Sequence, residues 1–220
     1  MRIRTVITAA VACLALAGCG NDAPTTSQPA GNQPANPAAP AASQPVPGYR
    51  ILTKAQLDAA LLGLDAMPAG YSEDDSSDTD TDRTFCNYRE PHKPKVEVNR
   101  VYIKGGGLSS ELLNVSLRQY AGPAEAKAAY AAMTKTLKTC RSWTDDGTKF
   151  TAKPMNLPSA GEASVGVRME ADGATLLLGY ALAGPTLVST GSAGLMTADA
   201  NIVGELLGKQ VAAYEEASIG

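Results

Sequence analysis

The chain has 220 residues, a formal charge of −3 and an isoelectric point near 5.2. This length allows one domain of ordinary size with its own hydrophobic core. The acidic balance, with no basic stripe in the sequence, argues against nucleic acid as a partner and against membrane attachment through a polybasic patch.

Residues 1–18 have the pattern of a bacterial export signal. Arg2 and Arg4 give it a positive start, and the apolar run from Val6 to Leu16 is shorter than the roughly twenty residues of a spanning helix. The run ends in Leu-Ala-Gly-Cys at 16–19, which resembles a bacterial lipobox. We therefore expect cleavage before Cys19 and lipidation of that residue with diacylglycerol and an acyl chain such as palmitate. The alternative is an ordinary secretory signal that happens to contain a cysteine.

Residues 19–48 are predicted to be a lipidated, disordered tether. The segment is rich in Pro, Ala, Gln, Asn, Ser and Thr and has almost no large apolar residue, so burial cannot offset the entropy of ordering it. At roughly 3.1 Å per residue where it is polyproline-like, it could hold a domain up to about 80–90 Å from the bilayer. We expect the protein at the cell membrane, anchored on the extracytoplasmic face through Cys19. A tail without function is the alternative.

Residues 49–220 are predicted to form one domain, which begins with a helix and two strands. Thr53 and Gln56 have the spacing of a capping box, and apolar residues recur at helical spacing after them, which predicts a helix over about 53–62. The runs 96–103 and 113–118 alternate apolar and polar residues and are joined by the glycine run 105–107. They predict an antiparallel pair with one apolar and one wet face.

The second half of the domain adds two helices and more strands. One helix opens at Pro123 and continues to Cys140 with its apolar residues on one face. Alternating runs at 165–169, 175–180 and 185–190 are separated by the hairpin signals at 172–173 and 183–184. A last amphipathic helix is predicted over about 198–215. This order predicts an α+β fold, a twisted antiparallel sheet with helices packed on one face.

Cys86 and Cys140 are predicted to form a disulfide. Of the four cysteines, Cys13 would leave with the signal and Cys19 would carry the lipid. An even remainder in an oxidising compartment is typical of a disulfide. Two cysteines and the only histidine, His92, cannot supply the four ligands of a structural zinc site.

The sequence lacks the pattern of a catalytic site, so we expect no enzyme activity and no cofactor or metal. A Ser-His-Asp site would need His92, which lies between two prolines and beside a lysine and is expected to be exposed. Ser192 lies in a stretch that we interpret as a loop before the last helix, and it is in no Gly-x-Ser-x-Gly elbow. The glycine run 105–107 precedes a strand, so it offers no helix terminus to a phosphate.

The acidic stretch 73–82 is the strongest candidate for a metal site. Asp78, Asp80 and Asp82 alternate, and calcium prefers such oxygen ligands. However, Arg83 stands where a calcium loop has glycine, and Arg89 stands where it has glutamate. We interpret the stretch as a solvated loop, and calcium binding is the alternative.

Several features together resemble the extracellular sensor domain of the mycobacterial serine/threonine kinase PknH type, which also occurs on stand-alone actinobacterial lipoproteins. They are the helix opening at 51–53, the segment at Phe85 and Cys86, the helix that ends at Cys140 before Trp143, the start of a late hairpin at 161–163, and the final helix. The resemblance covers about residues 49–217 and implies a twisted sheet with flanking helices and a cleft for an unidentified extracellular ligand. The kinase sensors typically contain two disulfides, whereas this chain can form one.

We therefore expect a surface-anchored lipoprotein with a non-catalytic, sensor-like domain that binds a small molecule, a lipid or an envelope protein outside the cell. The resemblance supplies no ligand-binding residues. A cell-envelope structural or assembly protein that acts through protein contacts is the alternative, and a large exposed apolar patch would favour it. A hydrolase with an unfamiliar carboxylate pair is a third hypothesis.

Overall fold

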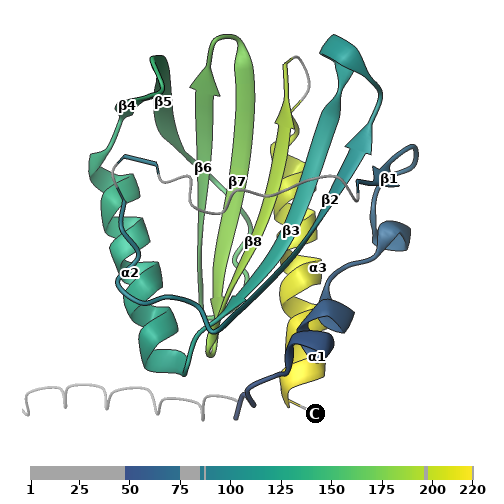
Figure 1. Ribbon diagram of the computed structural model, residues 1–220, viewed down its shortest axis with the longest axis vertical. Coiled ribbons are helices and arrows are strands. Elements are labelled where there is room, and N and C mark those ends of the chain that lie inside the picture. Colours follow the sequence, from purple (N-terminus) through teal and green to yellow (C-terminus); the bar gives the residue numbers. More distant parts are fainter. Residues whose placement is uncertain (1–47, 75–84, 87, 196–197, 220) are drawn as a thin grey trace, which may run out of the picture. The chain divides into compact units, whose positions relative to one another are not determined.

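An antiparallel sheet forms the centre of the domain (Figure 1). The computed structural model describes residues 48–74, 85–86, 88–195 and 198–219. Within these residues the sheet has eight strands in the order β1-β2-β3-β8-β7-β6-β5-β4, and all neighbours are antiparallel. The strands are β1 (Ser72–Glu73), β2 (Val96–Lys104), β3 (Glu111–Gln119), β4 (Ser142–Asp145), β5 (Thr148–Met155), β6 (Ala163–Ala171), β7 (Ala174–Ala183) and β8 (Thr186–Gly194).

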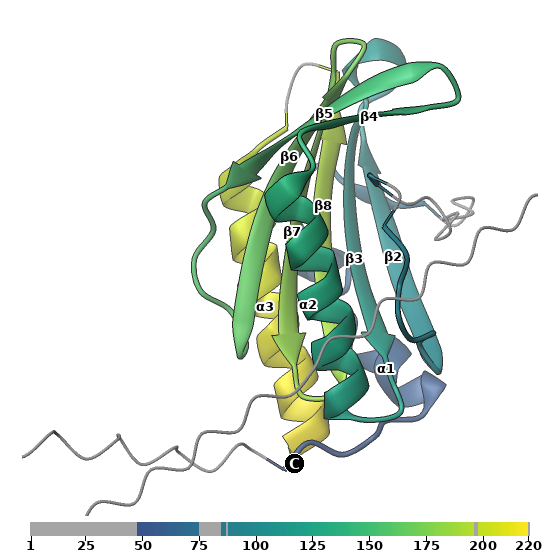
Figure 2. The ribbon, with the colours of Figure 1, turned by 90° about the vertical axis from the view of Figure 1, so that its left-hand side faces the viewer.

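Helices cover both faces of this sheet. α1 (Lys54–Ala60) and α3 (Ala200–Ile219) pack on one face, where Gly179 of β7 lies against Val203 and Leu207 of α3. α2 (Pro123–Thr139) packs on the other face, where the next residue, Tyr180, shares a core with Met133. Successive strand residues point to opposite faces, so these contacts place α2 and α3 on opposite sides. Figure 1 shows α3 behind the strands, and Figure 2 shows the two helices in the turned view.

The predicted α+β class and antiparallel sheet are confirmed, but the helices do not all share one face. α1 and α3 do so, and α2 lies opposite them. The reason is the composition of β7, which is apolar along most of its length on both faces, with Leu178, Tyr180 and Leu182 on the α2 face and Leu177, Gly179 and Ala181 on the α3 face. A strand of this kind needs a cover on each side.

The helices begin where the sequence predicts. The Thr53 side chain accepts a hydrogen bond from the backbone N–H of Gln56, and the Gln56 side chain accepts one from the backbone N–H of Thr53, which completes the capping box. α2 has Pro123 in its first turn and ends at the C-cap residue Cys140. The long final helix contributes much of the core on its own face of the sheet.

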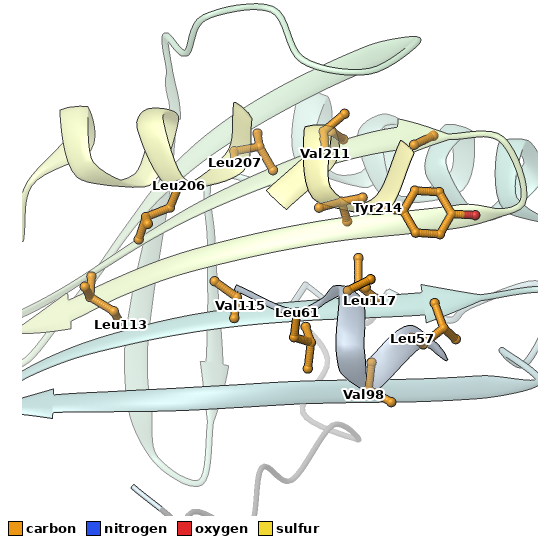
Figure 3. Close-up of a cluster of buried hydrophobic side chains, with 14 of the residues drawn as sticks. Leu57, Leu61, Val98, Leu113, Val115, Leu117, Leu206, Leu207, Val211 and Tyr214 are labelled. Atoms are coloured by element: carbon orange, nitrogen blue, oxygen red, sulfur yellow. The ribbon is translucent and has the colours of Figure 1, made fainter. Parts of the chain in front are cut away.

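The main core lies between the sheet and the helices α1 and α3 (Figure 3). β3 points Leu113, Val115 and Leu117 into it, each with no exposed surface. Leu207 and Tyr214 of α3 meet them and are equally buried. At about 1.5–3 kcal/mol per buried side chain, this cluster is the main source of the domain's stability.

Two buried glutamines attach the first helix to this core. Gln119 donates to the carbonyl of Leu52 over 2.7 Å and accepts from its N–H over 2.9 Å. Gln210 donates to the carbonyl of Ala60 over 2.8 Å and accepts from the N–H of Leu62 over 3.0 Å. Each amide satisfies buried backbone groups that would otherwise lack partners, so residues 52–62 are fixed at both ends.

The structure differs from the sequence-based predictions in two places. The hairpin of β4 and β5 was not predicted, although Asp146 and Gly147 form its turn with φ of 46° and 81°, the positive values that a type I′ turn requires. Ser192 was interpreted as part of a loop, but it is a buried residue of β8. It pairs in register with Leu113 and Leu177, and these neighbours extend the strand beyond the predicted end at 190.

The signal at 1–18, the lipidation site Cys19, most of the tether at 19–48 and the aspartates Asp78, Asp80 and Asp82 lie outside the described residues, so these predictions stay predictions. The predicted disulfide is present, with the Cα atoms of Cys86 and Cys140 6.1 Å apart. Among the described helices, none combines the length and the apolarity needed to cross a membrane.

Candidate ligand-binding site

An open cleft of about 940 Å³ lies on the sheet face that also carries α2. Its floor is formed by β2, β3, β8 and β7. One wall is formed around Met133 of α2, and the other by the described residues of the segment 85–94, which are 85–86 and 88–94. The α3 face of the same strands is closed by the main core. The volume lies within the range of about 300–1,000 Å³ that is typical of small-molecule sites.

The register of the strands arranges the floor in rows that run across the sheet. One row, which we call the polar row, contains Asn99 of β2, Ser116 of β3 and Ser189 of β8, which face one another in register. Tyr180 of β7 continues it. All four residues line the cleft. Asn and Ser side chains both donate and accept hydrogen bonds, so this row can bind uncharged polar groups.

A second row, the apolar row, lies four residues away along the strands. It contains Leu112 of β3, Ala193 of β8 and Leu176 of β7, which are also paired in register and line the cleft. Between the two rows lie Asn114 and Gly191. The floor therefore changes from polar to apolar along the strand direction.

Gly191 leaves the floor without a side chain between the polar row and the apolar row. A Cβ at this residue would lie 2.9 Å from a methyl group of Leu178, so a side chain cannot be accommodated without a shift. The absence of a side chain leaves backbone at the surface of the floor between Asn114 and Leu178. A glycine in a strand interior is typical of a place where another group approaches the backbone closely.

An ion pair closes the cleft beyond the polar row. Arg118 of β3 lies 3.1 Å from Glu90, and their side chains are only 18% and 20% exposed. Tyr120 donates a short hydrogen bond to the same carboxylate. Burial raises the pKa of Tyr120, although the charge of Arg118 opposes the rise, so the hydroxyl keeps its proton and remains the donor. We call this pair, Glu90 and Arg118, the charged end of the cleft.

The disulfide and a hydrogen bond from Tyr88 attach the second wall to α2. Cys86 is bonded to Cys140 at the end of α2, and the rings of Phe85 and Tyr88 stack with centroids 5.4 Å apart. The Tyr88 hydroxyl donates to the carbonyl of Ala129 over 3.3 Å. Burial raises the pKa of Tyr88 to about 12, and the nearby Glu90 carboxylate adds to the shift. The wall is thus fixed to α2 by a covalent bond and a hydrogen bond, and the stacked rings stiffen the wall itself.

The charges that line the cleft are balanced. The described lining has acidic side chains at Asp74, Glu90 and Glu97 and basic side chains at Arg89, Lys93 and Arg118. Because the two sets are equal in number, the described lining gives the cleft no strong net potential for a cation or an anion. Its recognition chemistry is hydrogen bonding together with apolar contact.

Most residues singled out by the sequence do not line the cleft. His92 is exposed next to Lys93, while Ser192 is buried on the α3 face, so the structure does not bring them together. Asn114, on the wet face predicted for 113–118, is part of the floor. Within the described ranges no group of three or more His, Cys, Asp or Glu side chains is arranged to hold a metal ion.

One pattern in the sequence could have located the floor. The wet face predicted for 113–118 contains Asn114, Ser116 and Arg118, and these residues face the cleft. Alternation indicates that a face is polar, but it does not show what lies above that face. Arg118, Asn99 and Ser189 were therefore missed as site residues.

Comparison with known proteins supports the fold alone. No protein-family model and no curated protein matches the chain. Among solved structures, the extracellular domain of PknH from Mycobacterium tuberculosis is similar, with a TM-score of 0.58 and 14% sequence identity, over 77% of this chain and 100% of that domain. The resemblance noted from the sequence therefore holds at the level of architecture.

Proposed function

We propose that this chain is a surface-anchored lipoprotein whose domain binds an extracellular ligand without transforming it. The ligand occupies the cleft between the polar row, the apolar row and the wall 85–94. The membrane is reached through the lipid at Cys19, and the signal passes on through another protein. The similarity in fold to the extracellular domain of PknH supports this proposal only through the shared architecture.

The proposal rests on a difference between the two faces of the sheet. One face is filled by α1 and α3, whereas β2, β3 and β8 leave an open cleft on the other. Its lining combines apolar and aromatic side chains with a few convergent polar groups, which is the usual composition of a ligand site. A wall fixed by a disulfide keeps such a site preformed, and this lowers the ordering cost of binding.

The predicted location outside the cytoplasm is consistent with the chemistry of the domain. A disulfide between Cys86 and Cys140 forms and persists in an oxidising compartment, outside the cytoplasm. Anchoring through two or more acyl chains needs no basic surface. If the anchor is correct, Cys19→Ser moves the protein from the membrane fraction to the soluble fraction. Membrane binding that persists in that variant contradicts the lipid anchor but leaves the cleft untouched.

An envelope assembly protein acting through protein contacts is the second candidate. Large exposed apolar residues in the described part of the chain include Leu108, Leu112 and Leu195, which lie near one end of the sheet, and Ile51, Leu64 and Ile219. Single exposed residues of this kind are ordinary on soluble proteins. The cleft is the more specific feature, and it favours ligand binding over this candidate and over a hydrolase.

Native mass spectrometry of the full chain, purified from its own host, tests the proposal. The wild type is expected to retain a molecule of discrete mass. Ser189→Trp fills the middle of the floor and is expected to lose this molecule, whereas Ser142→Trp, at an exposed position of β4, keeps it. Retention by Ser189→Trp, or loss from both variants, would show that the cleft is not the site.

A further inference from the structure

We infer that the ligand of the cleft is an amphiphile with an uncharged, hydroxyl-bearing head group and an alkyl chain, which lies along the strands. The head group rests on the polar row near the charged end, and the chain rests on the apolar row. This inference depends on the proposed function, because it names the chemical class that the same cleft accepts.

The inference rests on the direction in which polarity changes along the cleft floor. Along β3 the cleft-facing residues are Leu112, Asn114, Ser116 and Arg118 in that order, so polarity increases steadily towards one end. At about 3.4 Å per residue, these four positions span about 20 Å. A compact polar molecule would leave the apolar row unused, and a purely apolar molecule would bury the polar row without partners, which is costly. An elongated amphiphile satisfies both ends.

The polar end is suited to an uncharged head group. Asn99, Ser116 and Ser189 present an amide and two hydroxyls, each of which is both a donor and an acceptor, as the hydroxyls of a sugar or polyol are. Tyr180 adds an aromatic ring at the end of this row. Arg118 is already paired with Glu90 at 3.1 Å, so an anionic head group would have to compete with a carboxylate for it. The balanced charges of the lining point the same way.

The apolar end is formed by the floor. Leu112, Ala193 and Leu176 cross the sheet in register, and Leu178 of β7 adds an apolar side chain in the next row. Leu112 faces the cleft and is 37% exposed. An alkyl chain seated on this row would cover it, and each buried methylene would contribute about 0.8 kcal/mol.

The test uses alkyl glucosides with six to ten carbons, below their micelle concentrations, titrated by calorimetry into the full chain with Cys19→Ser. The heat measured with Ser189→Trp serves as the baseline for binding outside the cleft. The affinity of the wild-type cleft is expected to rise by up to about fourfold for each added methylene, which corresponds to about 0.8 kcal/mol. Free glucose is expected to bind at least about a hundredfold more weakly than octyl glucoside, since it lacks the chain.

Matched reagents and variants separate the two ends of the cleft. Octyl sulfate and octyl trimethylammonium are expected to bind at least about tenfold more weakly than octyl glucoside, because the lining has no net charge. Leu112→Asn is expected to flatten the dependence on chain length, whereas Leu64→Asn, at a similarly exposed residue with 46% exposure, leaves it intact.

Three results would overturn the inference: affinity independent of chain length, tighter binding of a charged amphiphile than of the glucoside, or equal titration of Ser189→Trp and wild type. The proposed function is judged separately by the molecule that the native protein retains. If that molecule is lost on Ser189→Trp while glucosides show no chain-length dependence, ligand binding in the cleft stands and its assignment to amphiphiles falls.

Discussion

The two faces of the sheet use their polar side chains differently. On the α3 face, Thr190 donates to the carbonyl of Val203 over 3.0 Å, and Thr186 donates to the Tyr214 hydroxyl over 2.8 Å. On the cleft face, Ser189 lines an open space. Thr186 and Thr190 on the closed face therefore join packed elements together, whereas Ser189 on the open face remains in reach of a ligand. Stability and recognition are thus divided between the faces of one sheet.

The largest expected effect comes from breaking the cleft wall. Removing the disulfide with Cys86→Ser and Cys140→Ser releases a loop of 54 residues in sequence separation, and we expect the free energy of unfolding to fall by about 4 kcal/mol. Urea unfolding under oxidising conditions measures this loss. A change below about 1 kcal/mol would mean that the wall is held by its other contacts. Retention of the ligand by the double variant would contradict the preformed wall.

The next effect tests the closed face. Gln210→Ala leaves the N–H of Leu62 and the carbonyl of Ala60 without their partners, and we expect a loss of about 2–3 kcal/mol from these two buried groups. Gln56→Ala removes an exposed glutamine that acts in a capping box, and it should cost about 0.5–1 kcal/mol. The shift of the urea midpoint compares the two. Equal shifts would show that the buried Gln210 side chain contributes no more to stability than the exposed Gln56.

Two neighbouring residues of β8 compare the faces most directly. Thr190→Val removes the hydrogen bond to α3 and is expected to lower stability by about 1 kcal/mol with ligand binding unchanged. Ser189→Ala changes a cleft-facing hydroxyl and is expected to alter stability by at most about 0.5 kcal/mol while weakening binding. Thermal unfolding and ligand retention measured on both variants decide the matter. The opposite pattern would reverse the roles assigned to the faces.

The smallest expected effect is the change in stability that follows the alkaline titration of Tyr88, a residue of the cleft wall. Burial raises the pKa of Tyr88 to about 12, so the folded state keeps this proton longer than the unfolded chain, whose tyrosines titrate near 10. The contribution of Tyr88 is therefore complete below about pH 10 and is lost as the pH rises through about 12. The ultraviolet absorbance difference between wild type and Tyr88→Phe should titrate near 12. A midpoint near 10 would place this hydroxyl in solvent.

Local patterns in the sequence predicted most elements of the fold. The capping box at Thr53, the proline at 123 and the alternation in β2, β3 and β6 each depend on neighbouring residues, and each prediction is confirmed. β5 was missed because its pattern is weak: only Phe150 and Ala152 give it an apolar face, and Pro154 is disfavoured in a strand. It becomes a strand through its pairing with β6, which is a tertiary contact.

The cleft could not be predicted because its parts are distant in sequence. Ser116 meets Ser189 only through the β3–β8 register, and Glu90 meets Arg118 only when the segment 85–94 folds over the sheet. Alternation reported a polar face on β3 but could not distinguish bulk water from a cleft. The disulfide was predictable by elimination among four cysteines, while its role in holding a cleft wall was not.

Photo-crosslinking in intact cells tests the central claim most directly. A photoreactive amino acid replaces Asn99, on the cleft floor, or Lys153, an exposed residue of β5 outside the cleft. Binding in the cleft predicts an adduct of one discrete mass at position 99 and none at position 153. Adducts of equal yield at both positions, or none at position 99, would contradict it.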